Sequence, residues 1–363
     1  MQHFRILLAF IAPLLVALWV LPHLSNIASR IGLIDYPNRR KIHKTPKPLI
    51  GGLGMVIGLA ISCLLFIPLS NLRGFYAGII MLAVVGFLDD FNELNHRWKF
   101  VIQMLAAVFM IIYSGTILYS FGDILSIGQL RFETYAIPMT ILCTVGVVNS
   151  INMIDGLDGL AGGVSLVAFV SFAVLALLNN QAELMLLSIS FCGALIAFLR
   201  YNWYPSKLFM GDAGSLSIGF CLAFLSIELT HDGNSTIPPV APLLVLAVPI
   251  VDTITVMIRR VLKGKNPFRA DKGHLHHILL KFGFSKRRTA MIIILLSLCF
   301  SSLGIAGAVL TIHEYYLFSV FGIYFIIYFI SSFSIRKLFM FKKQLKAKQK
   351  TEVVECKGGF ERV

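Results

Sequence analysis

The chain has 363 residues, of which 57% are hydrophobic and only 14% are charged, and its mean hydropathy is +0.81. Soluble globular proteins average about 45–50% apolar and about 25% charged residues, so this composition nearly excludes an ordinary soluble enzyme. It also excludes a disordered chain, because so much apolar surface needs burial. The formal net charge of +14 is compatible with nucleic acid, an anionic membrane face or an anionic substrate as partner.

Apolar segments long enough to cross a membrane recur along the whole chain. They predict an all-α integral membrane protein with a single domain over residues 1–340. A basic cytoplasmic tail, expected to be disordered, would follow at residues 341–363. We expect about eleven transmembrane spans, near residues 4–24, 49–69, 72–88, 100–120, 135–154, 157–178, 182–199, 210–229, 238–258, 289–310 and 314–335.

The distribution of lysine and arginine indicates how these spans are oriented, because both residues favour cytoplasmic loops. With the N-terminus outside and the C-terminus in the cytoplasm, 29 of the 32 lysines and arginines fall in cytoplasmic segments. This distribution accounts for most of the basic charge, so we expect no nucleic-acid partner. The cytoplasmic segments expected to build an active site are residues 25–48, 89–99, 149–158, 200–212 and 259–288.

Acidic residues from separate parts of the chain fall at the cytoplasmic ends of the predicted spans. Carboxylates close to hydrocarbon are costly and are therefore candidates for function. The neighbours Asp89 and Asp90 repel each other unless a cation or basic groups neutralise them. Asp155 and Asp158 lie three residues apart and would share one face of a helix. Asp252 lies inside a predicted span and could instead pair with a neighbouring helix.

A set of carboxylates from several regions of the chain suggests a divalent metal site. Oxygen ligands suit Mg²⁺ or Mn²⁺ better than zinc, and the six cysteines show no spacing typical of a zinc site. Mg²⁺ typically takes one or two protein ligands together with substrate phosphates. The acidic residues therefore predict a substrate that carries phosphate, and they favour a pyrophosphate.

Glycines accompany the acidic residues in two segments. Residues 153–163 read Met-Ile-Asp-Gly-Leu-Asp-Gly-Leu-Ala-Gly-Gly, and residues 209–215 read Phe-Met-Gly-Asp-Ala-Gly-Ser. Glycine lets a ligand approach the backbone at the start of a helix, where free N–H groups face anions. Glycines alone would be explained by a tight turn or by close helix packing. With an acidic residue beside each, they favour a binding site.

The most polar stretch is the loop from Arg259 to Arg288, which carries ten lysines and arginines and the sequence His274-Leu275-His276-His277. The histidines alone would fit a transition-metal site or a solvated loop. Beside so many cations and opposite a carboxylate-rich site, they look more like hydrogen-bond donors to phosphate and sugar. Arginine is suited to bidentate contacts with phosphate.

These segments together resemble a known family. Asp89-Asp90 and residues 149–159, 209–215 and 274–277 occur in the order typical of the polyprenyl-phosphate N-acetylhexosamine-1-phosphate transferases, a part of glycosyltransferase family 4. Within this family the chain is similar to the WecA/TagO branch, over about residues 30 to 290. Glu93 departs from the pattern, because an aspartate is common there, and we assign it no metal role.

The resemblance implies transfer of N-acetylglucosamine 1-phosphate from UDP-N-acetylglucosamine (UDP-GlcNAc) to undecaprenyl phosphate, with release of UMP. This reaction begins lipid-linked surface polysaccharides such as O-antigen, enterobacterial common antigen or teichoic acid. The resemblance places the active site on the cytoplasmic face of the bacterial inner membrane, with Mg²⁺ as cofactor and Mn²⁺ as its substitute. Membrane lipid would be a further partner. The resemblance leaves open whether the protein forms a homo-oligomer.

The resemblance also implies roles for individual residues. Asp212 and Asn152 would hold the metal, and Asp89 and Asp90 would form the catalytic pair. The substrates would be bound by Lys99, Asp155, Asp158, Phe209, Arg260, His274, His276 and His277. Phe209 would stack on the uracil. The acceptor phosphate is largely dianionic near neutral pH, so Asp90 could position the acceptor or bind metal instead of acting as a base.

Other classes of protein share some of these features. The leading alternative is an MraY-type transferase that uses UDP-MurNAc-pentapeptide, which the chain resembles less. A transporter or lipid flippase would place polar groups near the membrane midplane, whereas nearly all the acids here lie at one face. A CDP-alcohol phosphotransferase needs an arginine shortly after its Asp-Gly string, and Gly162-Gly163 stands there instead.

Overall fold

A computed structural model describes residues 2–37, 45–67, 72–92, 94–231, 235–267, 271 and 273–333 of the protein. The helices in chain order are α1 (Gln2–Ile31), α2 (Gly51–Phe66), α3 (Arg73–Asn92), α4 (His96–Ser114), α5 (Ala136–Ile154), α6 (Leu160–Leu178), α7 (Ala182–Asn202), α8 (Gly211–His231), α9 (Val240–Val245), α10 (Ala247–Val261), α11 (Leu275–Lys281), α12 (Lys286–Val309) and an unlabelled helix, Glu314–Phe333. Within the described residues, nine helices are long and apolar enough to cross a membrane. The chain is therefore a multi-pass membrane protein. The predicted tail at residues 341–363 and Glu93 lie outside the described residues.

Two of the eleven predicted spans take a different form. The segment near residues 49–69 forms α2, which has only 16 residues and is shorter than the nine candidate spans. The segment near residues 238–258 is broken at Leu246 into α9 and α10. Pro249 favours this break, because proline lacks an N–H group and its ring clashes with the carbonyl four residues earlier in a continuous helix.

The predicted cytoplasmic segment 25–48 contains regular structure. α1 extends into it, and a small antiparallel sheet follows, formed by β1 (Ile34–Asp35) and β2 (Lys47–Pro48). Directly after β2, Leu49 pairs with Phe209 in a parallel bridge. This pairing attaches the N-terminal part of the chain to the segment that precedes α8.

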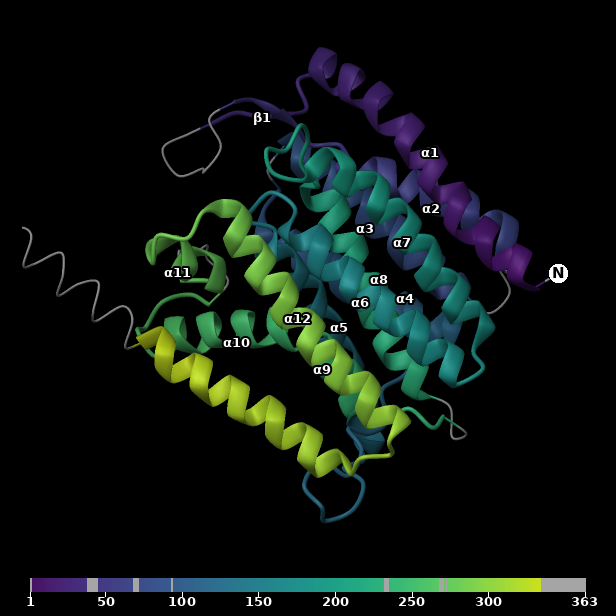
Figure 1. The fold of residues 1–363 in the computed structure, drawn as a ribbon, viewed down its shortest axis with the longest axis vertical. Helices are drawn as coiled ribbons and strands as arrows, with labels where there is room; N and C mark the ends of the chain where they lie inside the picture. The colour runs from purple at the N-terminus through teal and green to yellow at the C-terminus, as the bar shows by residue number, and fades with distance from the viewer. Residues whose placement is uncertain are drawn as a thin grey trace, which may run out of the picture.

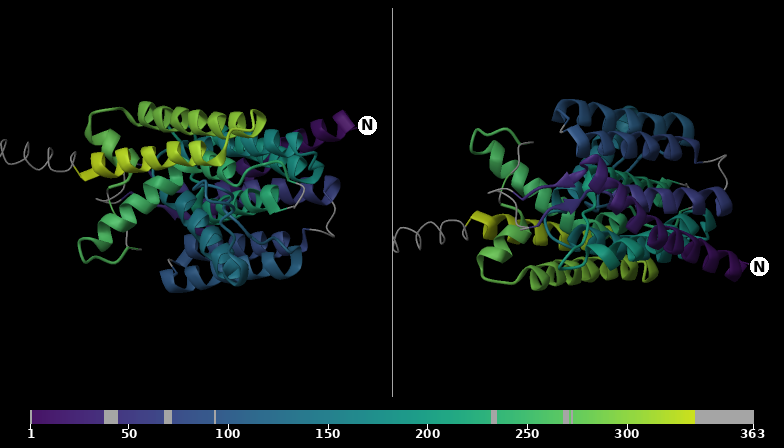
Figure 2. Two further views of the ribbon diagram at one scale, coloured as in Figure 1. Left: turned by 90° about the horizontal axis from the view of Figure 1, so that it is seen from below. Right: turned by 90° about the horizontal axis from the view of Figure 1, so that it is seen from above.

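α8 lies at the centre of the helix bundle (Figure 1), where α2, α3, α5 and α6 pack against it. Its sequence is rich in glycine, alanine and serine, which allow neighbouring helices to approach closely. α3 and α4 lie on one side of the bundle, and α12 with the helix Glu314–Phe333 lies on the opposite side (Figure 2). α10 runs across the direction of α12 (Figure 1).

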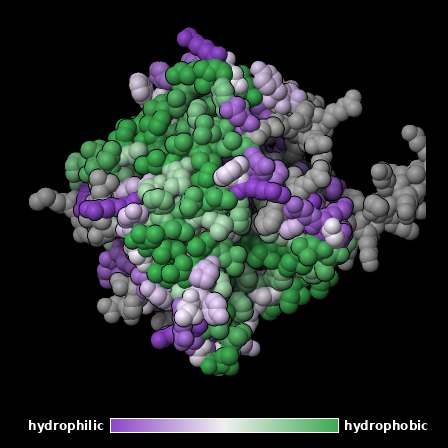
Figure 3. Space-filling view, turned by 180° about the vertical axis from the view of Figure 1, so that it is seen from behind, coloured by the Kyte–Doolittle hydropathy of each residue, from purple (hydrophilic) through white to green (hydrophobic). Residues whose placement is uncertain are grey.

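The outer surface of the bundle is largely apolar, as Figure 3 shows for one face. Large hydrophobic side chains of the peripheral helices are exposed, including Trp19 at 68%, Ile112 at 66% and Leu142 at 65%. A soluble protein rarely exposes so extensive an apolar surface. These side chains are therefore suited to face lipid.

The ends of the helices bring distant parts of the chain together. α3, α5 and α7 end at one end of the bundle, and α4, α6 and α8 begin there. The loops that join α4 to α5 and α8 to α9 meet at the opposite end. The acidic segments identified in the sequence therefore converge where α8 begins.

Candidate active site

A cleft of about 400 Å³ opens at the end of the bundle where α8 begins. Most of the residues predicted for the site line this cleft, namely Asp90, Asn152, Asp155, Asp158, Phe209, Asp212 and His277. The other predicted residues do not line the cleft, and they are Asp89, Lys99, Arg260, His274 and His276. The structure thus collects side chains from α3, α5, α8 and α11 around one space.

Lys99, in the first turn of α4, joins two carboxylates from different helices. Its Nζ contacts the carboxylate of Asp89 and lies 2.8 Å from Asp212 Oδ2. The side chains of Lys99 and Asp212 are 23% and 25% exposed, so these ion pairs are partly shielded from water. Asp89 Oδ1 also accepts a 2.7 Å hydrogen bond from the backbone N–H of Leu94. The ammonium group therefore offsets the negative charge of Asp89 on α3 and of Asp212 on α8.

Asn152, near the end of α5, lies on the other side of Asp212. Its amide donates hydrogen bonds to Asp212 Oδ1 (3.1 Å) and to the hydroxyl of Ser215 (2.8 Å). One oxygen of Asp212 thus faces Asn152 and the other faces Lys99. The two residues predicted as metal ligands are side by side at the cleft.

Asp90 accepts two backbone hydrogen bonds in the first turn of α8. The donors are the N–H groups of Asp212 (2.8 Å) and Ala213 (3.2 Å). A carboxylate is stabilised at this position, because the first N–H groups of a helix lack partners within the helix and carry partial positive charge. Gly211 precedes Asp212 with a φ of +72°, and a Cβ at this position would clash with the Asp90 carboxylate. Asp90 therefore fixes where α8 begins.

Asp155 and Asp158 follow α5, in the short loop before α6, so they do not share the face of a helix. Asp158 Oδ2 accepts a 3.1 Å hydrogen bond from the backbone N–H of Ser206 and lies 3.8 Å from Lys47 Nζ. Burial, together with the nearby carboxylates of Asp212 and Asp158, raises the pKa of Asp155 to about 7. Asp155 is therefore more readily protonated than an exposed aspartate.

Lys47 is a residue of the site that the sequence did not reveal. Its Nζ donates a 2.5 Å hydrogen bond to the hydroxyl of Ser206 and lies 5.0 Å from the centre of the Phe209 ring. Burial lowers the pKa of Lys47, and the carboxylate of Asp158 acts in the opposite direction. No local pattern marks this lysine, because Ser206 lies 159 positions later in the chain.

Asn202, at the end of α7, was also not predicted, although it lines the cleft. Its side-chain oxygen accepts a 2.9 Å hydrogen bond from the backbone N–H of Gly159, and its amide donates one of 2.9 Å to the carbonyl of Leu208. Asn202 therefore joins the start of α6 to the segment before α8.

The three histidines occupy different positions. His277 lines the cleft, whereas His276 lies behind Gly156, where a Cβ would clash with the imidazole ring. His274 Nδ1 lies 2.9 Å from Asp252 Oδ2 on α10. Burial lowers the pKa of His276 to about 3, and the nearby His277 and His274 act in the same direction, so this ring is neutral near pH 7.

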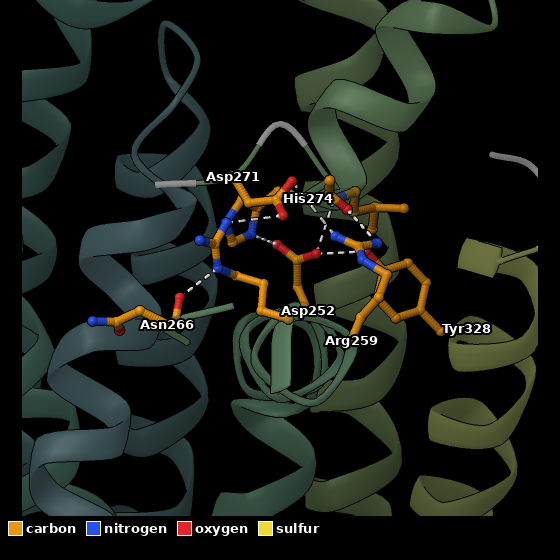
Figure 4. Close-up of polar contacts among 9 residues, drawn as sticks. Asp252, Arg259, Asn266, Asp271, His274 and Tyr328 are labelled. Atoms are coloured by element: carbon orange, nitrogen blue, oxygen red, sulfur yellow. Dashed lines mark hydrogen bonds and ion pairs between the residues drawn. The ribbon is translucent and has the colours of Figure 1, made fainter. Parts of the chain in front are cut away.

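Arg260, at the end of α10, does not line the cleft and contacts Asn266 and Asp271, which are labelled in Figure 4. Its Nη1 is 3.2 Å from Asp271 Oδ2, and its Nε donates a 2.7 Å hydrogen bond to the carbonyl of Asn266. Arg259 lies 3.8 Å from the other oxygen of Asp271. Both arginines therefore contact Asp271, which attaches the described part of the loop after α10 to the end of that helix.

A metal ion has suitable oxygen atoms at this site. Within the part of the chain that the structure describes, no group of three or more His, Cys, Asp or Glu side chains is arranged to hold one ion. Mg²⁺ needs fewer protein ligands, because it takes one or two carboxylates together with water and substrate phosphates. Asp212 and Asn152 could supply such ligands. Burial is the main cause of the raised pKa of Asp155, and the carboxylates of Asp212 and Asp158 add to it, so a cation nearby would favour the ionised form.

The sequence matches known proteins over this region and well beyond it. The family model described as glycosyl transferase family 4 matches residues 72–230, which include Asp89, Asp90, Asn152 and Asp212. A protein of Bacillus subtilis (strain 168), named as a probable undecaprenyl-phosphate N-acetylglucosaminyl 1-phosphate transferase, is 36% identical over 300 residues. The match covers 82% of this chain and 83% of that relative.

Relatives from other bacteria are also similar. The undecaprenyl-phosphate alpha-N-acetylglucosaminyl 1-phosphate transferase of Pasteurella multocida (strain Pm70) is 33% identical over 328 residues, which cover 89% of this chain and 92% of the relative. The protein of the same name from Escherichia coli (strain K12) is 28% identical over 287 residues, which cover 77% and 78%. The similarity thus extends over most of the chain.

Proposed function

Because the chain belongs to glycosyl transferase family 4, we propose that it transfers N-acetylglucosamine 1-phosphate from UDP-GlcNAc to undecaprenyl phosphate. The products are undecaprenyl-pyrophosphoryl-GlcNAc and UMP, and the reaction is the first step of a lipid-linked surface polysaccharide. The observation that carries the proposal is the relationship to proteins named for this activity, which match over most of both chains. The carboxylate-lined cleft at one end of a membrane bundle supports it.

The reaction is a phosphoryl transfer. An oxygen of undecaprenyl phosphate forms a bond to the β-phosphorus of UDP-GlcNAc, and the bond from that phosphorus to the bridging oxygen breaks, so UMP leaves. The attacking phosphate monoester has a second pKa near about 6 and is largely dianionic at neutral pH. It therefore needs no general base. The protein contributes positioning and neutralisation of charge.

Asp212 and Asn152 are the residues proposed to hold Mg²⁺, which Mn²⁺ could replace because both ions prefer oxygen ligands. The bound ion would supply neutralisation of the donor pyrophosphate. Lys99 keeps Asp212 in place and adds positive charge from the opposite side of this carboxylate. Asp90 acts on the same residue through the backbone, since it accepts the hydrogen bond from the Asp212 N–H group.

The nucleoside of the donor is proposed to lie near Phe209, with its uracil stacked on the phenyl ring. Lys47 lies over that ring, and Ser206 links Lys47 to Asp158. His277 lines the cleft together with the aspartates, and it is proposed to contact the sugar or the pyrophosphate. Arg260 and the remaining histidines would support this side of the cleft from behind.

We place the protein in the bacterial cytoplasmic membrane with the cleft facing the cytoplasm, because UDP-GlcNAc is a soluble donor. The excess of lysine and arginine in the same segments supports this orientation. Residues 1–340 would form one transferase domain, and residues 341–363 would lie at the cytoplasmic surface of the membrane.

The proposal is tested by an assay on membranes that contain the overexpressed protein, with radiolabelled UDP-GlcNAc, undecaprenyl phosphate and Mg²⁺. We expect butanol-extractable label that requires Mg²⁺ and that is lost in Asp212→Ala. Asp123→Ala is the matched control, because Asp123 is a carboxylate in the loop between α4 and α5, at the opposite end of the bundle. Turnover of UDP-MurNAc-pentapeptide in place of UDP-GlcNAc would contradict the proposed donor and favour an MraY-type transferase.

A further inference from the structure

Asp252 is a buried carboxylate on α10 that joins three segments of the chain. Its side chain lies between His274, Arg259 and Tyr328 (Figure 4), and the residue is only 2% exposed. Its oxygens accept hydrogen bonds from the hydroxyl of Tyr328 (2.5 Å) and the backbone N–H of Leu275 (2.9 Å). The ring of His274 lies at hydrogen-bond distance, 2.9 Å from Nδ1.

These contacts explain why a carboxylate can be buried here. An ionised carboxylate loses its hydration when it is buried, and this cost must be offset by hydrogen bonds or by opposite charge. Asp252 has three donors, one from each of Tyr328, Leu275 and His274. An ionised carboxylate can only accept, so His274 must carry a proton on Nδ1, which fixes the orientation of its ring.

The contacts continue from Asp252 to the cleft. Leu275 is the first residue of α11, so its hydrogen bond to Asp252 places the start of that helix. The rings of His274 and His276 are nearly parallel, with centroids 5.8 Å apart, and His276 lies against Gly156 in the cleft wall. His277 follows and lines the cleft itself.

We infer that Asp252 and Tyr328 are positioning residues that hold the histidine segment, residues 274–277, against the cleft. Neither residue lines the cleft, so both act through His274 and α11. The helix Glu314–Phe333 thereby helps to shape the active site, although it contributes no side chain to the lining. The inference rests on the proposed function, because His277 is taken to contact the donor.

The first test is the conservative variant Tyr328→Phe, which removes the hydroxyl and keeps the ring. Loss of a hydrogen bond to a buried charged group should reduce kcat/KM roughly tenfold. Because the affected segment borders the donor side of the cleft, we expect a higher KM for UDP-GlcNAc and an unchanged KM for undecaprenyl phosphate. Asp252→Asn should have the same kind of effect.

Tyr324→Phe is the matched control. Tyr324 lies one turn earlier on the same helix, with its ring centroid 6.3 Å from that of Tyr328. Its buried hydroxyl has no hydrogen-bond partner among the described residues, so its removal should leave both KM values and kcat unchanged. Equal losses in the two variants would mean that packing of this helix, and not the contact with Asp252, is responsible.

A double-mutant cycle with His277→Ala separates positioning from general destabilisation. If Tyr328 acts through the histidine segment, Tyr328→Phe should cost much less kcat/KM in the His277→Ala background than in the wild type. A loss of the same size in both backgrounds would overturn the inference, because the two residues would then act independently.

Hydrogen exchange supplies a readout that does not depend on turnover. In the full-length protein in detergent, Tyr328→Phe should accelerate amide exchange in residues 273–284, and Tyr324→Phe should not. Unchanged exchange in Tyr328→Phe would overturn the inference, as would faster exchange without any change in kcat/KM. Wild-type protein that does not turn over UDP-GlcNAc would contradict the proposed function alone, since the exchange result would still decide whether Tyr328 holds this segment.

Discussion

The backbone N–H of Asp212 donates a 2.8 Å hydrogen bond to the carboxylate of Asp90, so an acid at the end of α3 determines where another acid at the start of α8 is presented. Asp212 is held from two further directions, by Lys99 and by Asn152. The position of this carboxylate is therefore set by three helices besides its own.

Asp90→Asn should lower both stability and activity. An asparagine side chain offers one oxygen where Asp90 accepts two N–H groups, so its own NH₂ group would face one of these donors. We expect a loss of about 1–2 kcal/mol in the free energy of unfolding and a parallel loss of turnover. Thermal unfolding in detergent and the label-transfer assay measure the two effects. Full turnover with an unchanged melting temperature would show that the contact with α8 is dispensable.

Lys99→Met should reduce turnover by about 100-fold or more, in the range seen when one donor to a reacting oxyanion is removed. The substitution keeps an apolar side chain of similar length but leaves Asp89 and Asp212 without their shared cation. Lys207→Met is the control, because Lys207 is an exposed lysine at the same end of the bundle. If both variants lost activity equally, the loss would reflect the general charge of this end of the protein.

Gly156→Ala should impair donor binding, because the added Cβ would collide with the ring of His276. Overpacking of this kind costs about 1–3 kcal/mol, and α11 or the loop after α5 would have to shift. We expect a higher KM for UDP-GlcNAc. Gly146→Ala in α5 is the control, since a Cβ there meets no atom within 4 Å and the substitution should be neutral or slightly stabilising. Identical kinetics for the two variants would contradict the role of the contact with His276.

Asp155 should make stability depend on pH in the absence of metal. Its pKa rises from 3.8 in the unfolded chain to about 7 in the fold, so the folded state binds the extra proton between these values. The contribution of Asp155 to stability is therefore greatest at low pH and is lost as pH rises through about 7. Asp155→Asn should remove this dependence. The check is the difference in melting temperature between variant and wild type in EDTA, which should grow from pH 5 to pH 8 and shrink when Mg²⁺ is added.

Sequence patterns revealed the parts of the site that are local. The Asp89-Asp90 pair and the acidic glycine segments stand out because their residues are adjacent, and they lie in or beside the cleft. The contacts of Asp90 with α8 were not predictable, because a carboxylate that accepts backbone N–H groups leaves no trace in its own neighbourhood. Lys47 and Tyr328 were missed for a related reason, since their partners lie 159 and 76 positions away.

The spans show a similar limit. Nine apolar runs correspond to full-length helices, because their length and composition are sufficient to define them. The break between α9 and α10 depends on Pro249, but proline alone does not decide, since α1 contains Pro13 and Pro22 and continues without interruption. Whether a proline breaks a helix depends on what packs around it, and the sequence of that helix does not state this.

The hydrogen bond from Tyr328 to Asp252 also has a consequence for biosynthesis. The ribosome delivers every residue that lines the cleft before it delivers the helix Glu314–Phe333. A nascent chain that has inserted its earlier helices already holds its acids together but lacks the contact that secures the histidine segment. We therefore expect a chain truncated before the helix Glu314–Phe333 to consume its lipid acceptor more slowly than the full-length protein.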